Sequence, residues 1–446
     1  MFDTLLVANR GEIARRIIRT ARAMGIRTVA VHSDVDADLP FVTEADESVL
    51  IGAAAPALSY RNVDAILRAA RDTGARAVHP GYGFLSENAG FARAVVDAGL
   101  IWVGPSGEVI ERMGDKINAR NLMQDAGVPV APGTREPVGD PAVARRLADE
   151  IGFPIMIKAS AGGGGMGMAV AHDPAGLAEQ VATIGAFAER TFGDGSVLLE
   201  RFLPVARHVE VQILGLPDGR VLALGERDCS VQRRNQKVAE ETPSPAVGPD
   251  LRERMLAAAA RAGETVGYVG AGTVECLVDE AAQDFVFLEM NTRLQVEHPI
   301  TEAVTGIDLV RQQLLIAAGE PIDFDPDAVT PTGHAIEFRV NAEDPKRFLP
   351  GPGVVREWVE PSGTGIRVDA GYAAGTTVTP HYDSLMAKLV VHGATREEAL
   401  ARARAAVAGF TVVGPKNNLP FFAELLDNAE FVSGRYDTGI VGRMRA

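Results

Sequence analysis

The sequence predicts an α/β region followed by an α+β region, and so a chain of more than one domain. Its 446 residues exceed what one hydrophobic core usually serves. Up to about residue 114, short apolar strands alternate with helical patterns, which is typical of a parallel sheet. Beyond residue 115, strand patterns follow one another with few helices between them, which indicates antiparallel pairing.

The first region begins with a strand–helix–strand unit. Residues 4–8 (TLLVA) predict a buried strand, Asn9 is a candidate helix cap, and a helical face leads to Gly25. Residues 28–31 predict the next strand, and the short crossover makes the two strands parallel. Helices near 62–73 and 87–98, with strands at 77–79 and 101–103, complete an open sheet over residues 1–114. The turn after the first strand holds one glycine, Gly11, where a dinucleotide site needs three, which argues against a nicotinamide cofactor.

The second region begins with strands rather than alternating units. Strands are predicted at 154–160, 168–171, 197–200 and 208–214, with a helix from Pro174 to Arg190. Residues 273–280 and 285–291 predict a hairpin with an acidic turn. The Pro- and Asp-rich segment 321–333 indicates a connector, and the remainder mixes short strands with a helix near 396–409.

Composition excludes several classes of function. The net charge of -15 argues against non-specific binding to nucleic acid or to an anionic membrane. We expect neither a transmembrane helix nor a signal peptide, because no apolar run approaches about 18 residues and charges follow the first strand closely. Cys229 and Cys276 are interpreted as packing residues, which favours a cytoplasmic location.

A lysine and a glycine tract form the first candidate site. Lys158 ends an apolar strand, and Gly162 to Gly165 follow it. Bare backbone amides beside an ammonium suit phosphate oxygens, although a flexible linker would have the same composition. The pattern is not a Walker A loop, because no Gly-Lys-Ser/Thr follows.

Two carboxylates on the predicted hairpin form the second candidate site. If the strands pair across 280–284, Glu275 and Glu289 lie close together on one face, with Asn291 after them. Close carboxylates repel, and a divalent cation relieves this repulsion; oxygen ligands suit Mg²⁺ or Mn²⁺. The alternative is a pair of exposed strand glutamates.

The polar segment after this hairpin is the third candidate. Arg293 could hold a small planar anion, and Glu297 could act as a general base. The alternative is a surface ion pair of little energetic value. Other segments have ordinary alternatives: a solvated hairpin face for 226–237, a tight turn for 79–83 and a surface lysine for Lys116.

Together these segments resemble the biotin carboxylase family of the ATP-grasp superfamily. The resemblance covers nearly the whole chain, through LLVANRGEIA (5–14), HPGYGFLSEN (79–88), GDKINAR (114–120), KASAGGGGMGM (158–168), RHVEVQ (207–212), ERDCSVQRRNQK (226–237), EMNTRLQVEHPITE (289–302), FRVNAEDP (338–345) and HYDSLMAKL (381–389). It implies a Rossmann-like N-terminal domain (1–114), an ATP-grasp domain (115–330) with a mobile lid (about 131–203), and a C-terminal biotin carboxylase domain (331–446).

The resemblance also implies roles for individual residues. ATP binding falls to Lys116, Lys158, Gly164, Gly165, Glu200, Arg201, Phe202, Leu203, His208, Asn235, Glu275 and Glu289. Mg²⁺ or Mn²⁺ falls to Glu275, Glu289 and Asn291, and the bicarbonate and biotin sites to Lys237, Arg293, Gln295, Val296, Arg339 and Tyr82. The catalytic residues are Glu297 as general base, Arg293, Lys237, and Arg339 against the biotin oxyanion. Two positions depart from the family: Met166 often has a basic counterpart, and Asn235 often a histidine.

The implied activity is carboxylation of biotin by ATP and bicarbonate through carboxyphosphate, the first half-reaction of an acyl-CoA carboxylase in fatty acid metabolism. No Met-Lys-Met tripeptide for biotin attachment occurs, so we expect biotin on a separate biotin carboxyl carrier protein; the alternative is that the chain is part of a longer multidomain carboxylase. The resemblance further implies a carboxyltransferase partner and a homodimer. Two alternatives stay open: another ATP-grasp carboxylate ligase, and a catalytically silent nucleotide-binding scaffold.

Overall fold

The N-terminal part of the computed structural model, which describes residues 1–160 and 167–446, is a five-stranded parallel sheet in the order β3-β2-β1-β4-β5. Its strands are β1 (Thr4–Val7), β2 (Arg27–Ser33), β3 (Glu47–Gly52), β4 (Ala77–His79) and β5 (Ile101–Trp102). Its helices are α1 (Gly11–Ala23), α2 (Pro40–Glu44), α3 (Val63–Asp72), α4 (Ala89–Asp97) and α5 (Gly107–Gly114). The α/β prediction is confirmed, and the edge strand β3 was not predicted.

Asn9 does not cap the first helix, which corrects the sequence-based expectation. Arg10 is the N-cap of α1 and makes no side-chain cap bond. The Asn9 Nδ2 instead donates to the carbonyl oxygens of Pro80 and Tyr82, each at 2.7 Å. Because β1 and β4 are neighbouring parallel strands, their carboxyl ends meet, and Asn9 joins the two loops there.

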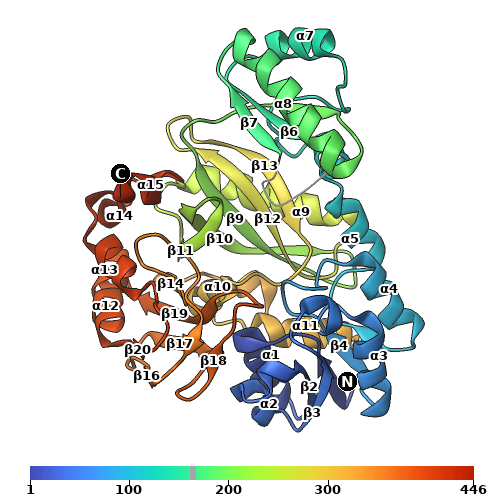
Figure 1. Cartoon of the computed structure of the whole chain (residues 1–446), viewed down its shortest axis with the longest axis vertical. Helices are drawn as coiled ribbons and strands as arrows, with labels where there is room; N and C mark the ends of the chain where they lie inside the picture. The colour runs from blue at the N-terminus through green and yellow to red at the C-terminus, as the bar shows by residue number, and fades with distance from the viewer. Residues whose placement is uncertain (161–166) are drawn as a thin grey trace.

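An eight-stranded antiparallel sheet forms the centre of the molecule, in the order β13-β12-β9-β10-β11-β14-β19-β17 (Figure 1). The predicted hairpin is confirmed as β12 and β13. Strand β11 pairs with β14, so one sheet continues across the connector at 321–333. The strands are β9 (Arg207–Gly215), β10 (Val221–Arg233), β11 (Gln236–Thr242), β12 (Gly270–Asp279), β13 (Asp284–Asn291), β14 (His334–Asn341), β17 (Ile366–Ala370) and β19 (Leu385–Gly393). The accompanying helices are α6 (Lys116–Asp125), α9 (Pro249–Val266), α10 (His298–Thr305) and α11 (Leu309–Ala317).

A smaller body stands apart from this sheet, at the top of Figure 1. It has a three-stranded antiparallel sheet in the order β7-β6-β8. Its own hydrophobic cluster includes Ile155, Ile157, Leu177 and Leu199. Its elements are α7 (Pro141–Ile151), β6 (Ile155–Ala159), β7 (Met168–Ala171), α8 (Pro174–Phe192) and β8 (Val197–Arg201). Because it has a separate core, this body has the structural independence of a lid.

The C-terminal part packs on the far end of the central sheet. Its helices are α12 (Arg396–Gly409), which matches the predicted helix, α13 (Leu419–Asp427), α14 (Ala429–Ser433) and α15 (Ile440–Arg445). Two small antiparallel pairs join β15 (Gly353–Val354) to β18 (Thr377–Val378) and β16 (Glu357–Val359) to β20 (Thr411–Val413). One core cluster unites Leu5 and Ile17 of the N-terminal part with Leu389 and Phe422 of the C-terminal part. None of the helices in the described ranges has the length and apolar character needed to cross a lipid bilayer.

Candidate active site

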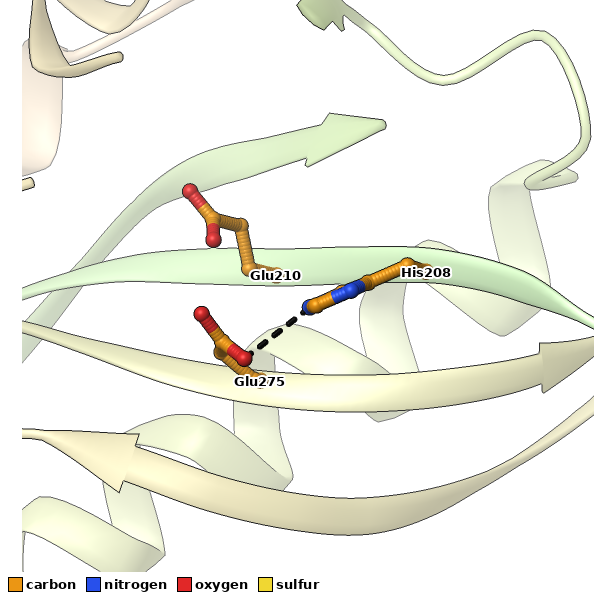
Figure 2. Close-up of side chains that lie close together, drawn as sticks. All are labelled: His208, Glu210 and Glu275. Atoms are coloured by element: carbon orange, nitrogen blue, oxygen red, sulfur yellow. Dashed lines mark ion pairs between the residues drawn. The ribbon is translucent and has the colours of Figure 1, made fainter. Parts of the chain in front are cut away.

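A row of charged side chains crosses four neighbouring strands of the central sheet. Glu289, Glu275, Glu210 and Arg227 are direct cross-strand partners on β13, β12, β9 and β10. Directly paired residues project on the same face of a sheet, so the register itself assembles the row. Figure 2 shows Glu210 and Glu275 with His208, whose Nε2 lies 3.0 Å from the Glu275 Oε2.

Lys237 of β11 is the cation at the centre of this row. Its Nζ lies 2.5 Å from Glu210, 2.7 Å from Glu275 and 2.8 Å from Glu297. Burial lowers the pKa of the Lys237 ammonium, but the three carboxylates outweigh burial and raise the pKa well above its usual value. The lysine therefore stays charged and neutralises part of the acidic cluster.

Glu297 is fully buried, and cations surround its carboxylate. Besides Lys237, the Arg339 Nη2 lies 2.8 Å from its Oε2, and the Arg339 Nε bonds Glu240 at 2.6 Å. Burial raises the pKa of Glu297, but Lys237, Arg339 and Arg227 outweigh burial and hold the pKa well below 4.5. Such a carboxylate is ionised and can accept a proton from a substrate placed against it.

The segment 292–297 continues the site beyond the end of β13. The Arg293 Nη1 donates to the Gln295 Oε1 at 2.5 Å, and the Arg293 Nε bonds Glu87 at 3.1 Å. The Gln295 amide in turn donates to Glu275 at 3.3 Å and to Asn291. The predicted anion-binding residues and the predicted metal ligands therefore belong to one hydrogen-bonded network.

The acidic residues predicted to bind a metal fit a hard divalent cation. Glu275 and Glu289 are direct cross-strand partners, and the Asn291 Nδ2 lies 3.5 Å from the Glu289 Oε1. The Lys116 Nζ lies 3.0 Å from the Glu289 Oε2. Two carboxylates and an amide oxygen are the donors that Mg²⁺ prefers. The ligand atoms of His208, Glu210 and Glu275 also gather within 4.8 Å, but the Lys237 ammonium already contacts both of these glutamates.

The smaller body contains a second lysine, Lys158, which is linked to α6 through Glu200. Lys158 of β6 pairs with Glu200 of β8. The Glu200 Oε1 also lies 3.9 Å from the Nε of Arg120, which is one helical turn from Lys116 on α6. Phe202 and Leu203 follow β8, and the Phe202 amide donates to the Pro154 carbonyl at 2.9 Å. Gly164, Gly165 and Met166 lie outside the described residues.

The structure also describes Asn235, Tyr82 and the two cysteines. Asn235 sits at the exposed tip of the β10–β11 hairpin, where Arg234 and Asn235 have φ of 49° and 66°. Such positive φ values suit a two-residue hairpin turn. Tyr82 lies 5.8 Å, by its ring centroid, from the Lys388 Nζ. Cys229 and Cys276 are buried free thiols, and burial raises the pKa of both. Cys229 does more than pack, because its Sγ donates to the Glu297 Oε1 at 3.7 Å.

Sequence reasoning missed several charged residues of the site. The solvated interpretation of 226–237 is wrong for Arg227, which is fully buried and bonds Glu210 at 2.6 Å. Glu210 could have been found, because period-two alternation on a strand puts it on the face of His208. Glu240 carried no such signal, since it reaches the site through a pairing that is distant in sequence. Glu87 stands out in the sequence beyond the turn at 79–83, but its bonds to Thr292 and Arg293 join distant segments and could not be predicted.

The fold and the site together indicate a class of enzyme. Cations and paired carboxylates on a sheet face, beside a separate lid, suit an enzyme that acts on phosphate groups of a nucleotide. Family models match in the same order: Biotin carboxylase, N-terminal domain (1–110), Carbamoyl-phosphate synthase L chain, ATP binding domain (115–324), and Biotin carboxylase C-terminal domain (337–443).

Curated relatives and solved structures agree with these matches. The biotin carboxylase of Halalkalibacterium halodurans is 49% identical over 99% of this chain and 97% of the relative. The biotin carboxylase of Haemophilus influenzae is 48% identical over 97% of this chain and 97% of its own length. A biotin carboxylase–ATP complex from Campylobacter jejuni has a TM-score of 0.95 at 40% identity, covering 99% of both chains. The biotin carboxylase domain dimer of Hydrogenobacter thermophilus 2-oxoglutarate carboxylase, solved with MgADP and bicarbonate, has a TM-score of 0.93 at 42% identity, covering 99% and 98%. The chain belongs to the biotin carboxylase family.

Proposed function

We propose that this chain uses ATP and bicarbonate to carboxylate biotin carried by a separate carrier protein. The observation that supports this most is the buried Glu297 carboxylate, held between the Lys237 ammonium and the Arg339 guanidinium beside the Arg293–Gln295 pair. An ionised carboxylate beside guanidinium groups suits the binding and deprotonation of a small oxyanion.

In the proposed reaction Glu297 removes the proton of bicarbonate, which Arg293, Gln295 and Val296 orient. The bicarbonate oxygen attacks the γ-phosphate of ATP, forming carboxyphosphate and ADP. Lys116 and Lys158 neutralise the phosphate charge, with His208 and the glycines Gly164 and Gly165 near the same phosphates. Glu275, Glu289 and Asn291 would hold Mg²⁺ or Mn²⁺, which supplies further neutralisation of phosphate charge when bound.

The second stage transfers carbon dioxide. Carboxyphosphate splits into CO₂ and phosphate, the phosphate takes the N1′ proton of biotin, and the resulting anion attacks CO₂. Arg339 stabilises the negative charge on the ureido oxygen of biotin. Tyr82 is proposed as a further residue of the bicarbonate and biotin site. Glu200, Arg201, Phe202, Leu203 and Asn235 are proposed for the nucleotide's adenosine side.

The wider setting completes the proposal. We assign residues 1–114, 115–330 and 331–446 to three domains, with 131–203 as the lid. Partners are the carrier protein and a carboxyltransferase that passes the carboxyl group to the final acceptor. The Hydrogenobacter relative supports a homodimer, and the unpaired cysteines fit a cytoplasmic setting. Identifying the proteins that co-purify with the chain would distinguish an acyl-CoA acceptor from a keto acid.

The deciding experiment measures ATP hydrolysis with and without bicarbonate and free biotin. We expect hydrolysis that depends on bicarbonate and rises with biotin. Glu297→Gln should lower the rate by about 10²- to 10⁴-fold, the usual contribution of a general base, and leave ATP binding intact. Hydrolysis that requires another carboxylate would indicate a different ligase, and nucleotide binding without hydrolysis would indicate a scaffold.

A further inference from the structure

Two segments of the chain have no role in the proposed reaction, although each contains a buried charge. Glu12 lies in the first turn of α1 and Lys388 in the middle of β19. Lys388 is fully buried and Glu12 is 4% exposed. The Lys388 Nζ lies 3.1 Å from the Glu12 Oε2, so the pair joins the N-terminal and C-terminal parts. Burying two charges costs free energy, and a fold with hydrophobic residues of similar volume in place of a buried ion pair is often equally stable or more stable.

Lys388 also contacts the segment that carries the candidate base. Its Nζ donates to the carbonyl oxygen of Val296 at 3.0 Å. This carbonyl belongs to the peptide unit that joins Val296 to Glu297. A fixed carbonyl direction constrains ψ of Val296 and φ of Glu297, and hence the position of the Glu297 side chain.

The preceding carbonyl is held in the same way by His298. The His298 Nδ1 lies 2.7 Å from the Gln295 carbonyl oxygen, which can only accept, so Nδ1 carries the proton. Burial, followed by Lys388 and Arg16, lowers the pKa of His298 well below its usual value, so the ring is neutral. Two consecutive carbonyls therefore bond buried side chains, while the Gln295 and Glu297 side chains bond the active-site row.

We propose that Lys388, anchored by Glu12, is a positioning residue that fixes the Val296–Glu297 peptide for bicarbonate binding and deprotonation. The proposal rests on the assignment of bicarbonate to this segment under the proposed function. An apolar residue at position 388 could fill the same volume, but only a donor can hold the carbonyl. Small displacements of a reacting group are expensive in rate, so the buried pair serves geometry rather than stability.

The test compares Lys388→Met, Glu12→Gln and the double variant in the full-length enzyme. Lys388→Met should raise KM for bicarbonate, or lower kcat/KM for it, by about 10- to 100-fold, with KM for ATP nearly unchanged. Glu12→Gln removes the carboxylate that lies 3.1 Å from the buried Lys388 ammonium, so it should lower Tm. In the double variant both charges are gone, so Tm should recover while the bicarbonate defect stays as large as in Lys388→Met.

The double variant separates positioning from a merely structural role, and it also serves if Lys388→Met fails to fold. Lys416→Met is the matched control, because this lysine is 69% exposed and pairs with Asp344 at the surface. Recovery of both Tm and bicarbonate kinetics in the double variant would overturn the proposal, as would equal changes in KM for ATP and bicarbonate. If the parent enzyme lacks bicarbonate-dependent hydrolysis, the proposed function itself fails. If the parent has this activity and Lys388→Met has the same bicarbonate kinetics as the parent, only the positioning role fails.

Discussion

At the scale of single residues, the site depends on cations that keep buried carboxylates ionised. Lys237 contacts three glutamates, and Arg339 contacts two, Glu240 and Glu297. Burial raises the pKa of Glu240 to about 7, against the opposing effect of Arg339. Glu297, with Lys237, Arg339 and Arg227 nearby, has a lowered pKa instead. Near neutral pH the Glu297 carboxylate is therefore ionised, whereas the Glu240 carboxyl is partly protonated.

Replacing Arg339 should therefore change the pH dependence as well as the rate. Arg339→Met removes one of the cations that lower the pKa of Glu297, so this pKa should rise. The acid limb of the kcat/KM profile should move to higher pH, and biotin carboxylation should fall by about 10²- to 10³-fold while ATP affinity changes little. Arg339→Lys, which keeps the charge, should shift the acid limb less. A Met variant whose acid limb matches that of the parent would contradict the role of Arg339.

Glu289 provides a separate prediction about the metal. Its carboxylate is 34% exposed and has Lys116 as its cation. Glu289→Gln removes one negative ligand, so the Mg²⁺ concentration for half-maximal ATP hydrolysis should rise by about 10- to 100-fold. Excess Mg²⁺ should restore part of the rate, and EDTA should abolish activity of both proteins. Glu253→Gln, on the exposed side of α9, is the control, and an equal effect there would refute a ligand role for Glu289.

At the scale of elements, the sequence predicted where the strands lie better than it predicted which strands pair with one another. The β12–β13 hairpin is local, so its turn and periodicity revealed both the pairing and the opposition of Glu275 to Glu289. The pairings of β9 with β12 and of β11 with β14 join segments distant in sequence, and no local pattern encodes them. Glu240 was missed because its position depends on the β11–β14 pairing. Arg227 and Glu210 face each other across the local β9–β10 hairpin, so strand alternation could have revealed them.

Glu241 shows how such a long-range pairing is stabilised. This buried carboxylate on β11 bonds His334 of β14 at 2.6 Å, Arg396 of α12 at 2.7 and 2.9 Å, and Tyr436. Burial raises its pKa, but the bonds from His334 and Arg396 outweigh burial and lower the pKa from 4.5 to about 2. A lowered pKa stabilises the fold above pH 4.5, and this contribution is lost as pH falls toward 2.

Glu241→Gln should accordingly lower the free energy of unfolding at pH 7 by about 3 kcal/mol. The difference from the parent should shrink by about 1 kcal/mol by pH 4, because the parent has begun to lose its contribution there. Urea unfolding from pH 7 to pH 4 measures both quantities, with Glu253→Gln as the control. A difference that does not change over this range would show that the ionised carboxylate is not the source of the stability.

At the scale of the whole molecule, the α/β and α+β classes were predicted and the missing elements have physical reasons. Strand β3 is an edge strand whose Ser48 and Leu50 are exposed, so it lacks a continuous apolar run. The core that unites Leu5 with Phe422 joins the two ends of the sequence, which composition cannot show. The lid followed from the family resemblance, and its separate core adds a physical reason for it to move as a unit.

The lid leads to a prediction about the whole molecule. Lys158 pairs with Glu200 inside the lid, and the Glu200–Arg120 contact at 3.9 Å is a weak link to the body. The phosphate oxygens of a nucleoside triphosphate are stronger partners for Lys158 than Glu200 is, so a bound nucleotide should draw the lid onto the central sheet. Hydrogen exchange should therefore slow in β7 and β8 on addition of a non-hydrolysable MgATP analogue, and change little in β17 and β19, which are far along the sheet order. Lys158→Met should bind the analogue more weakly and, even at saturation, give less protection in β7 and β8. Protection spread evenly over all elements, or equal protection in the Met variant, would mean that the lid does not close through Lys158.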